Sequence, residues 1–221
     1  MLEYELTETA ATPTFCVIWM HGLGADGHDF APIVPQLNLP QTPGIRFIFP
    51  HAPEQPVTIN GGYVMRAWYD IIAPDLRARQ DRDGIVQSAQ YIEELIAWQQ
   101  QQGIAEQNII LAGFSQGAAM ALHVGLRSGK AFGGIMALSG YLPLADELPV
   151  EPATANNKPP IFMAHGSYDP IVPLAAGTQS RQQLDALGYA VEWNQYPMEH
   201  AVCVEEIADI GRWLRQVTGA E

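Results

Sequence analysis

The stretch that decides the fold is Asn108-Ile-Ile-Leu-Ala-Gly-Phe-Ser-Gln-Gly-Ala-Ala-Met-Ala-Leu122. Its first five residues predict a buried strand, and its last five predict the start of a helix. The turn between them, Gly113-Phe-Ser-Gln-Gly117, fits G-x-S-x-G, in which a serine sits on a sharp strand-to-helix turn. Side chains in place of the two glycines would collide with the neighbouring strand or helix. We therefore expect Ser115 to be a nucleophile; the alternative is an ordinary strand-to-helix turn.

The segments on either side alternate between short apolar runs and helical patterns, which predicts a mainly parallel sheet with helices on both faces. The predicted strands are Thr14–Met20, Ile45–Phe49, Asn108–Ala112, Gly134–Leu138, Pro160–Ala164 and Val191–Tyr196. Helices are predicted over Asp83–Gln102, after Gln116, from near Pro173 to near Gly188, and over Val202–Val217, where Glu205 and Glu206 suit the first turn. The segment from His51 to Asp81 is rich in Pro, Gly and aromatic residues, and we expect it to be irregular and functional.

A serine hydroxyl needs a general base at neutral pH, and the base needs an acid that orients it. In a fold with this turn the acid and the histidine follow the serine in that order. Three histidines follow Ser115. His123 falls inside the helix after the serine, and His165 leaves few candidates for the acid before it. His200 lies in a loop between the last strand and the last helix, so we assign it as the base.

The acid must then lie between Ser115 and His200. Asp169 follows the strand Pro160–Ala164, and the carboxyl ends of strands are where such sheets place catalytic groups. Glu199 adjoins the histidine but would have to fold back on it, so it ranks second. Asp169 is the predicted acid.

The oxyanion formed during attack needs two hydrogen-bond donors. One is expected to be the backbone N–H of Gln116, the residue after the nucleophile. The other is expected from His21-Gly-Leu-Gly24, a glycine-rich loop after an early strand, and we assign it to the backbone N–H of Leu23. A phosphate-binding loop is the alternative: Gly22-Leu-Gly-Ala-Asp-Gly27 has the G-x-G-x-x-G spacing, although the G-K-[ST] pattern is absent from this loop. The His21 side chain is expected to be a structural hydrogen-bonding group.

Composition excludes several classes of protein. The 221 residues fit one domain, 1–221, and the formal net charge of −13 argues against a nucleic-acid partner. No stretch reaches about 18 uninterrupted apolar residues, so no integral membrane association is expected. Two distant cysteines, Cys16 and Cys203, indicate no disulfide framework and favour a cytoplasmic location. His21 and His28 lie near Asp26 and Asp29, but their spacing matches no zinc motif, so no metal is expected.

Four sequence motifs outside the Ser115 turn, taken together with it, resemble those of one enzyme family. They are His21-Gly-Leu-Gly-Ala-Asp-Gly-His28, Asn60-Gly-Gly with Arg66-Ala-Trp-Tyr-Asp70, His165-Gly-Ser-Tyr-Asp-Pro-Ile-Val-Pro173 and Tyr196-Pro-Met-Glu-His200. With Gly113–Gly117 they make the chain resemble the carboxylesterase/acyl-protein thioesterase family, also called the phospholipase/carboxylesterase family, from about Thr14 to Leu214.

The resemblance implies a minimal α/β-hydrolase without a separate cap domain, the triad Ser115, Asp169 and His200, and an oxyanion hole from Leu23 and Gln116. It also implies no cofactor and often a homodimer. Glu199 and Ala201 depart from the family's common glycine and serine at these places.

We therefore expect a serine carboxylesterase that acts on a small-molecule substrate, a short- to medium-chain carboxylic ester or thioester, through an acyl-enzyme. The alternatives are a lysophospholipase or acyl-protein thioesterase for long acyl chains, and a non-catalytic interaction protein on the same scaffold. An acyl groove is expected in the irregular segment, with Trp68, Met65 and Ile71 as substrate-binding residues.

Overall fold

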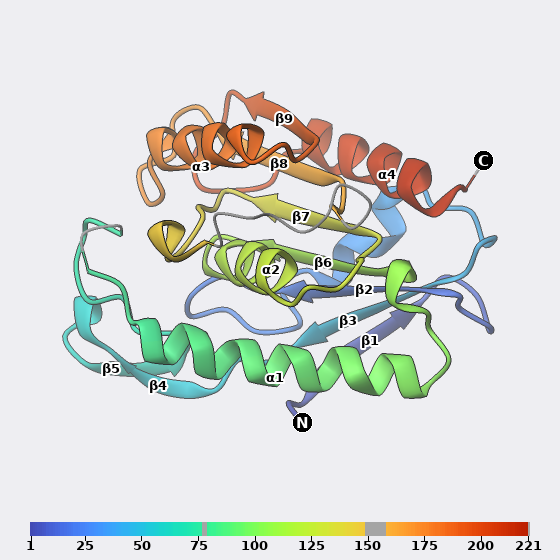
Figure 1. Ribbon diagram of the computed structural model, residues 1–221, viewed down its shortest axis with the longest axis horizontal. Coiled ribbons are helices and arrows are strands. Elements are labelled where there is room, and N and C mark those ends of the chain that lie inside the picture. The colour runs from blue at the N-terminus through green and yellow to red at the C-terminus, as the bar shows by residue number, and fades with distance from the viewer. Residues whose placement is uncertain (77–78, 149–157, 221) are drawn as a thin grey trace.

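The computed structural model describes residues 1–76, 79–148 and 158–220, and a seven-stranded sheet in the order β1-β3-β2-β6-β7-β8-β9 forms its centre (Figure 1). Each neighbouring pair of strands is parallel except β1 and β3. The strands of this sheet are β1 (Tyr4–Glu8), β2 (Phe15–Met20), β3 (Ile45–Pro50), β6 (Ile109–Phe114), β7 (Gly134–Leu138), β8 (Ile161–Gly166) and β9 (Val191–Tyr196).

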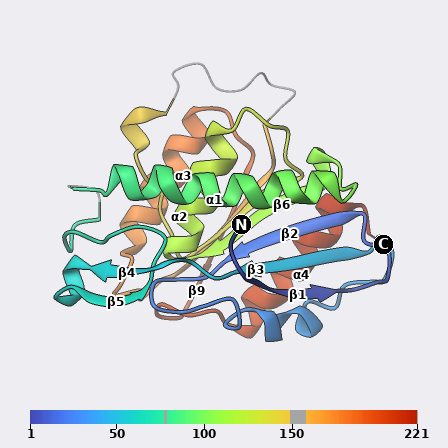
Figure 2. The same ribbon diagram turned by 90° about the horizontal axis from the view of Figure 1, so that it is seen from below.

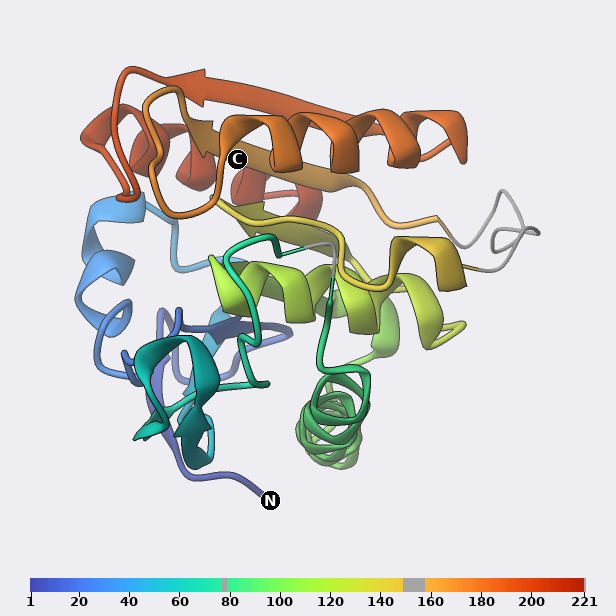
Figure 3. The ribbon, with the colours of Figure 1, turned by 90° about the vertical axis from the view of Figure 1, so that its left-hand side faces the viewer.

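Helices cover both faces of the sheet because its central strands are apolar on both sides (Figure 3). On one face lie α1 (Arg82–Gln101), α2 (Gln116–Arg127) and α3 (Leu174–Ala186). On the other lie α4 (Val204–Thr218) and the 3₁₀ helix η1 (Ala31–Leu37). Shorter 3₁₀ turns are η2 (Thr58–Asn60), η3 (Glu106–Asn108) and η4 (Ala145–Glu147). No helix within the described ranges has the length and apolar character needed to cross a membrane.

The parallel register decides which loops meet. Met20 at the end of β2 pairs with Gly113 near the end of β6, so the loops that follow these strands leave the sheet side by side. The loops after β8 and β9 leave from the same edge, since these strands are parallel to β7 and to each other. This edge is where a parallel sheet places its ligands.

The predicted parallel sheet, its six strands and its four helices are confirmed, with bounds that differ by at most two residues. Three strands were not predicted. β1 is a partly exposed edge strand, and β4 (Glu54–Val57) pairs with β5 (Tyr63–Arg66) within the segment expected to be irregular. Figure 2 shows this hairpin beside the main sheet rather than within it. Each of its four-residue strands has two exposed residues, and the two strands together have one buried residue, so they lack the apolar periodicity that reveals a strand.

Glu206 lies in the first turn of α4, where a carboxylate is usually exposed to solvent, but here it is buried. Its side chain is fully buried, and within the described part of the chain neither carboxyl oxygen has a hydrogen-bond partner. Burial raises the pKa of this carboxyl from 4.5 to about 8, and the charge of Asp209 adds to the shift. Glu206 is therefore a protonated, neutral group in the folded protein at neutral pH.

We expect Glu206→Gln to make stability less dependent on pH. Between pH 4.5 and about 8 the folded chain keeps a proton that the unfolded chain releases, so the free energy of unfolding falls as pH rises. A neutral glutamine removes this loss, on the order of a few kcal/mol at pH 8. Melting temperatures from pH 5 to 9 should show the variant gaining on the wild type as pH rises. The exposed neighbour Glu205→Gln is the control, and an equal response of both variants would contradict the assignment.

Candidate active site

Ser115 sits on the sharp turn between β6, which ends at Phe114, and α2, which begins at Gln116. The backbone of Ser115 is strained, with φ 55° and ψ −115°, and 8 % of the residue's surface is exposed. A Cβ on Gly113 would overlap the backbone of Gly117, and a Cβ on Gly117 would overlap the backbone of Met20. Glycine is therefore required at both places, and the strained turn holds the serine at the carboxyl edge of the sheet.

Asp169 and His200 come together from the loops after β8 and β9. Oδ2 of Asp169 lies 2.7 Å from Nδ1 of His200, and the Asp169 side chain is fully buried. The carboxylate accepts a hydrogen bond from Nδ1–H, which leaves the lone pair of the neutral ring on Nε2. The ring of Phe114, the residue before the serine, lies 4.7 Å from the His200 ring between centroids. The arrangement gives His200 the tautomer that a general base needs.

The Asp169 carboxylate is held on its second oxygen as well. Oδ1 accepts hydrogen bonds from the backbone N–H groups of Ile171 and Val172, each at 2.9 Å. His165, near the end of β8, contacts the loop that carries Asp169. Its Nε2 lies 2.8 Å from the carbonyl oxygen of Val172 and 3.6 Å from Oδ2 of Asp169. Burial lowers the pKa of His165, so this ring stays neutral beside the acid. The loop therefore fixes the acid before any substrate binds.

Leu23 and Gln116 lie beside Ser115, and all three line one cavity. The N–H of Gln116 belongs to the first residue of α2, where no helical carbonyl is available to accept it. Gly22 brings the other loop close, because a Cβ on it would lie only 3.4 Å from Cβ of Ser115. Leu23 and Gln116 thus line the same cavity as the serine, and their role as oxyanion donors stays a prediction.

The cavity has a volume of about 490 Å³ and a mostly apolar wall. Ile59, Ile71, Leu76 and Ile171 contribute to this wall. Tyr69 and Tyr141 line it too, and their hydroxyl oxygens lie 2.9 Å apart. Burial raises the pKa of both phenols, so both are neutral. A neutral, apolar hollow beside the nucleophile suits an acyl chain.

The sequence-based assignment of Trp68 to this groove is wrong. Its side chain has no exposed surface, and neither Trp68 nor Met65 is among the described residues that line the cavity. Met65 lies on β5, with its sulfur 3.5 Å from Nδ2 of Asn60. Of the three predicted substrate-binding residues, only Ile71 lines the cavity. An indole can be buried as easily in the core as in a groove, and the local pattern does not separate the two.

Trp68 links the two sides of the site. Its indole N–H donates to the carbonyl oxygen of His21 at 2.9 Å, and its backbone N–H donates to Oε1 of Gln116 at 2.8 Å. The amide nitrogen of Gln116 in turn donates to the carbonyl oxygen of Tyr69 at 2.7 Å. Sequence reasoning used only the backbone of Gln116 and missed its side chain. A polar side chain at the start of a buried, mostly apolar helix was the available signal.

Glu5, His28 and His51 form the one group, within the described residues, whose side chains are close enough to share a metal ion. His28 Nε2 and His51 Nε2 lie 3.1 and 3.5 Å from Oε1 of Glu5. However, Nδ1 of His51 accepts the N–H of Gly27 at 3.1 Å, so neutral His51 carries its proton on Nε2 and offers no lone pair there. The grouping of His21 with His28 considered from the sequence is not formed. Without His51, Glu5 and His28 supply only two of the three protein ligands that a catalytic zinc site needs.

Comparison with known proteins agrees with this geometry. The model of the phospholipase/carboxylesterase family matches residues 3–218. Acyl-protein thioesterase 1 of Neurospora crassa is 42 % identical, over 96 % of this chain and 90 % of that protein. Acyl-protein thioesterase 1 of Yarrowia lipolytica is 37 % identical, over 93 % of each chain.

Solved structures agree as well. The crystal structure of Zea mays acyl-protein thioesterase 2 superposes with a TM-score of 0.87 at 26 % identity, covering 99 % of this chain and 100 % of that one. Arabidopsis thaliana SOBER1 gives a TM-score of 0.83 at 29 % identity, covering 92 % and 98 %. The chain therefore belongs to the phospholipase/carboxylesterase family of α/β-hydrolases and is an enzyme of the serine hydrolase type.

Proposed function

We propose that the protein hydrolyses short- to medium-chain carboxylic esters or thioesters through an acyl-enzyme on Ser115. The observation that carries the proposal is the 2.7 Å contact between Asp169 and His200, beside a strained Ser115 that lines an apolar cavity. The relatives named acyl-protein thioesterases support thioesters among the substrates.

In the proposed reaction, Nε2 of His200 takes the proton of Ser115 as the serine oxygen attacks the acyl carbon. The carbonyl oxygen becomes an oxyanion, which accepts hydrogen bonds from the N–H groups of Leu23 and Gln116. The new imidazolium is stabilised by Asp169 and returns its proton to the departing alcohol or thiol. Water, activated by the same histidine, then attacks the acyl-enzyme and releases the acid and Ser115.

Chain-length preference is proposed to come from the cavity wall. The wall is apolar next to Ser115, and at its rim Ile59 and Ile171 are 41 % and 62 % exposed. A short acyl chain would be enclosed, whereas the end of a long chain would extend into solvent. Each enclosed methylene contributes at most about 0.8 kcal/mol, or about fourfold in kcat/KM.

We expect Ile71→Ala to lower kcat/KM about tenfold for an octanoyl ester and less than about twofold for an acetyl ester, because only the longer chain reaches this part of the wall. The measurement is a series of p-nitrophenyl esters and matched thioesters from two to sixteen carbons, with wild type and variant. Ile72→Ala, next in the chain but outside the described lining of this cavity, is the control.

Equal losses on both esters would mean that Ile71 supports the loop and not the substrate. In the wild type, a kcat/KM that keeps rising beyond about twelve carbons would favour the long-chain alternative, a lysophospholipase or long-chain acyl-protein thioesterase.

Two further features of the proposal concern the protein as a whole. Cys16 and Cys203 are free thiols, which supports a reducing compartment such as the cytoplasm. The homodimer implied by the family resemblance stays a prediction, which sedimentation of the purified protein would test.

A further inference from the structure

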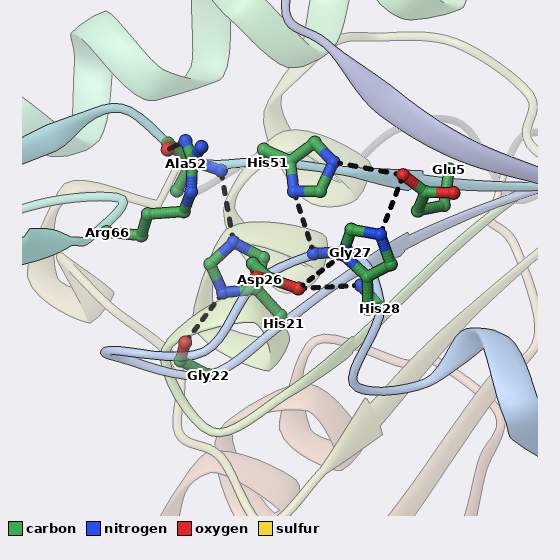
Figure 4. Close-up of polar contacts among 9 residues, drawn as sticks. All are labelled: Glu5, His21, Gly22, Asp26, Gly27, His28, His51, Ala52 and Arg66. Atoms are coloured by element: carbon green, nitrogen blue, oxygen red, sulfur yellow. Dashed lines mark hydrogen bonds and ion pairs between the residues drawn. The ribbon is translucent and has the colours of Figure 1, made fainter.

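Two histidine rings join the loops that follow β2 and β3, each ring accepting a backbone N–H from the other loop (Figure 4). His21, directly after β2, accepts the N–H of Ala52 on Nε2 at 3.0 Å. His51, directly after β3, accepts the N–H of Gly27 on Nδ1 at 3.1 Å. The loop from His21 to Gly27 is therefore fastened at both ends to the same neighbour.

The hydrogen bonds of His21 define where its proton lies. The N–H of Ala52 can only donate, so Nε2 must offer its lone pair and the proton must sit on Nδ1. Nδ1 lies 2.7 Å from the carbonyl oxygen of Gly22, to which it therefore donates. Burial lowers the pKa of His21 to about 4; Asp26 acts in the opposite direction, and His51 and Arg66 reinforce the effect. The neutral Nδ1–H form thus persists throughout the neutral range.

The carbonyl that His21 holds belongs to the same peptide plane as the N–H of Leu23. In a planar trans peptide the C=O and the N–H point in opposite directions, so fixing the oxygen also fixes the direction of the N–H. The N–H of Ala25 gives the Gly22 oxygen a second and longer hydrogen bond, at 3.3 Å. Gly22 itself lies against Phe114 and Ser115. The Gly22–Leu23 peptide plane, which His21 holds, therefore lies beside Ser115.

The peptide between His21 and Gly22 is fixed too. The carbonyl oxygen of His21 accepts the indole N–H of Trp68. Ala52, whose N–H donates to the His21 ring, accepts a hydrogen bond on its own carbonyl oxygen from Nη1 of Arg66 at 2.8 Å. The His21 ring is 1 % exposed, so no water competes for Nδ1 or Nε2. A rotation of the Gly22–Leu23 plane would break a buried hydrogen bond of the ring.

We propose that His21 is a positioning residue that sets the Gly22–Leu23 peptide so that the Leu23 N–H faces the oxyanion. The inference rests on the proposed function, in which this N–H is an oxyanion donor. His21 touches no reacting atom in this scheme and acts only through the peptide. His51 fastens the far end of the same loop through Gly27.

The test uses two substitutions that each keep one of the ring's two hydrogen bonds. In His21→Asn the side-chain amide N–H replaces Nδ1–H and can still hold the Gly22 oxygen. In His21→Gln the amide oxygen replaces Nε2 and can still accept the Ala52 N–H. Each variant loses one buried hydrogen bond, so their melting temperatures should fall by similar amounts.

Activity should separate the two variants. We expect kcat for a p-nitrophenyl ester to fall about 10- to 100-fold in His21→Gln and less than about threefold in His21→Asn, with KM nearly unchanged in both. Binding of a trifluoromethyl ketone, which forms a tetrahedral oxyanion adduct with the serine, should weaken in His21→Gln by a similar factor. His28, which directly follows Gly27 and has an exposed side chain, is the control (Figure 4), and His28→Asn should leave kcat unchanged.

Equal kcat values in His21→Asn and His21→Gln, or losses that follow the melting temperature alone, would overturn the inference. Such a result would leave the proposed function standing if Ser115→Ala is inactive. If Ser115→Ala keeps the wild-type rate, the proposed function itself fails, and the positioning role fails with it.

Discussion

Ser115→Ala is expected to abolish ester hydrolysis, with kcat falling by at least about 10³-fold. The hydroxyl is the proposed nucleophile, and the remaining residues can only assist a slow attack by water. Alanine removes one oxygen from a residue that is 8 % exposed and leaves the backbone turn as it is, so the fold should remain. The measurement is kcat on a p-nitrophenyl ester, with the melting temperature as the check on folding.

Ser139 provides a matched control. It is also buried and also has a positive φ, 48°, and within the described residues its hydroxyl has no hydrogen-bond partner. Ser139→Ala should therefore keep most of the activity and should still react with a fluorophosphonate, whereas Ser115→Ala should not react. If Ser115→Ala stayed fully folded and retained most of the wild-type rate, the acyl-enzyme mechanism would have to be abandoned.

Asp169→Asn is expected to lower kcat by about 10³- to 10⁴-fold while leaving KM nearly unchanged. The backbone N–H groups of Ile171 and Val172 both point at Oδ1, so the asparagine must keep its oxygen there and turn its NH₂ toward Nδ1 of His200. The histidine would then have to accept on Nδ1 and carry its proton on Nε2. In that tautomer Nε2 has no lone pair for the Ser115 proton.

The control for this substitution is Glu199→Gln, since Glu199 is the other carboxylate considered for the acid role. Glu199 is exposed, and Ala201 donates only to its backbone carbonyl. Its neutral variant should keep wild-type kcat. A large loss in Glu199→Gln together with a small loss in Asp169→Asn would reverse the assignment of the acid.

The elbow, the order of the triad and the parallel sheet could be predicted because each depends on short-range pattern. Gly113 and Gly117 define the turn within five residues. Asp169 follows a strand whose apolar run is plain in the sequence, and His200 follows the next predicted strand, Val191–Tyr196. The loops they occupy must meet because parallel strands end at one edge. Such reasoning needs no knowledge of side-chain packing.

The features that could not be predicted depend on packing between distant segments. Trp68 is apolar in either role, and only the tertiary structure decides that its indole faces the core and the carbonyl of His21. The reciprocal hydrogen bonds of His21 and His51 join residues 31 and 24 positions apart, for which no local signal exists. An acidic residue suits the first turn of a helix whether it is exposed or buried, so the burial of Glu206 could not be predicted from the sequence either.

The placement of the site across four strand ends also bears on how the chain folds. His21, Ser115, Asp169 and His200 follow β2, β6, β8 and β9, and β9 is the last strand in both sequence and sheet order. Contacts between segments so far apart in the chain form late, after the loops between them have closed. Helix α2 and the elbow can form locally, but the base reaches the acid only when β9 docks. Regain of activity during refolding therefore marks completion of the whole sheet, later than the return of helical signal.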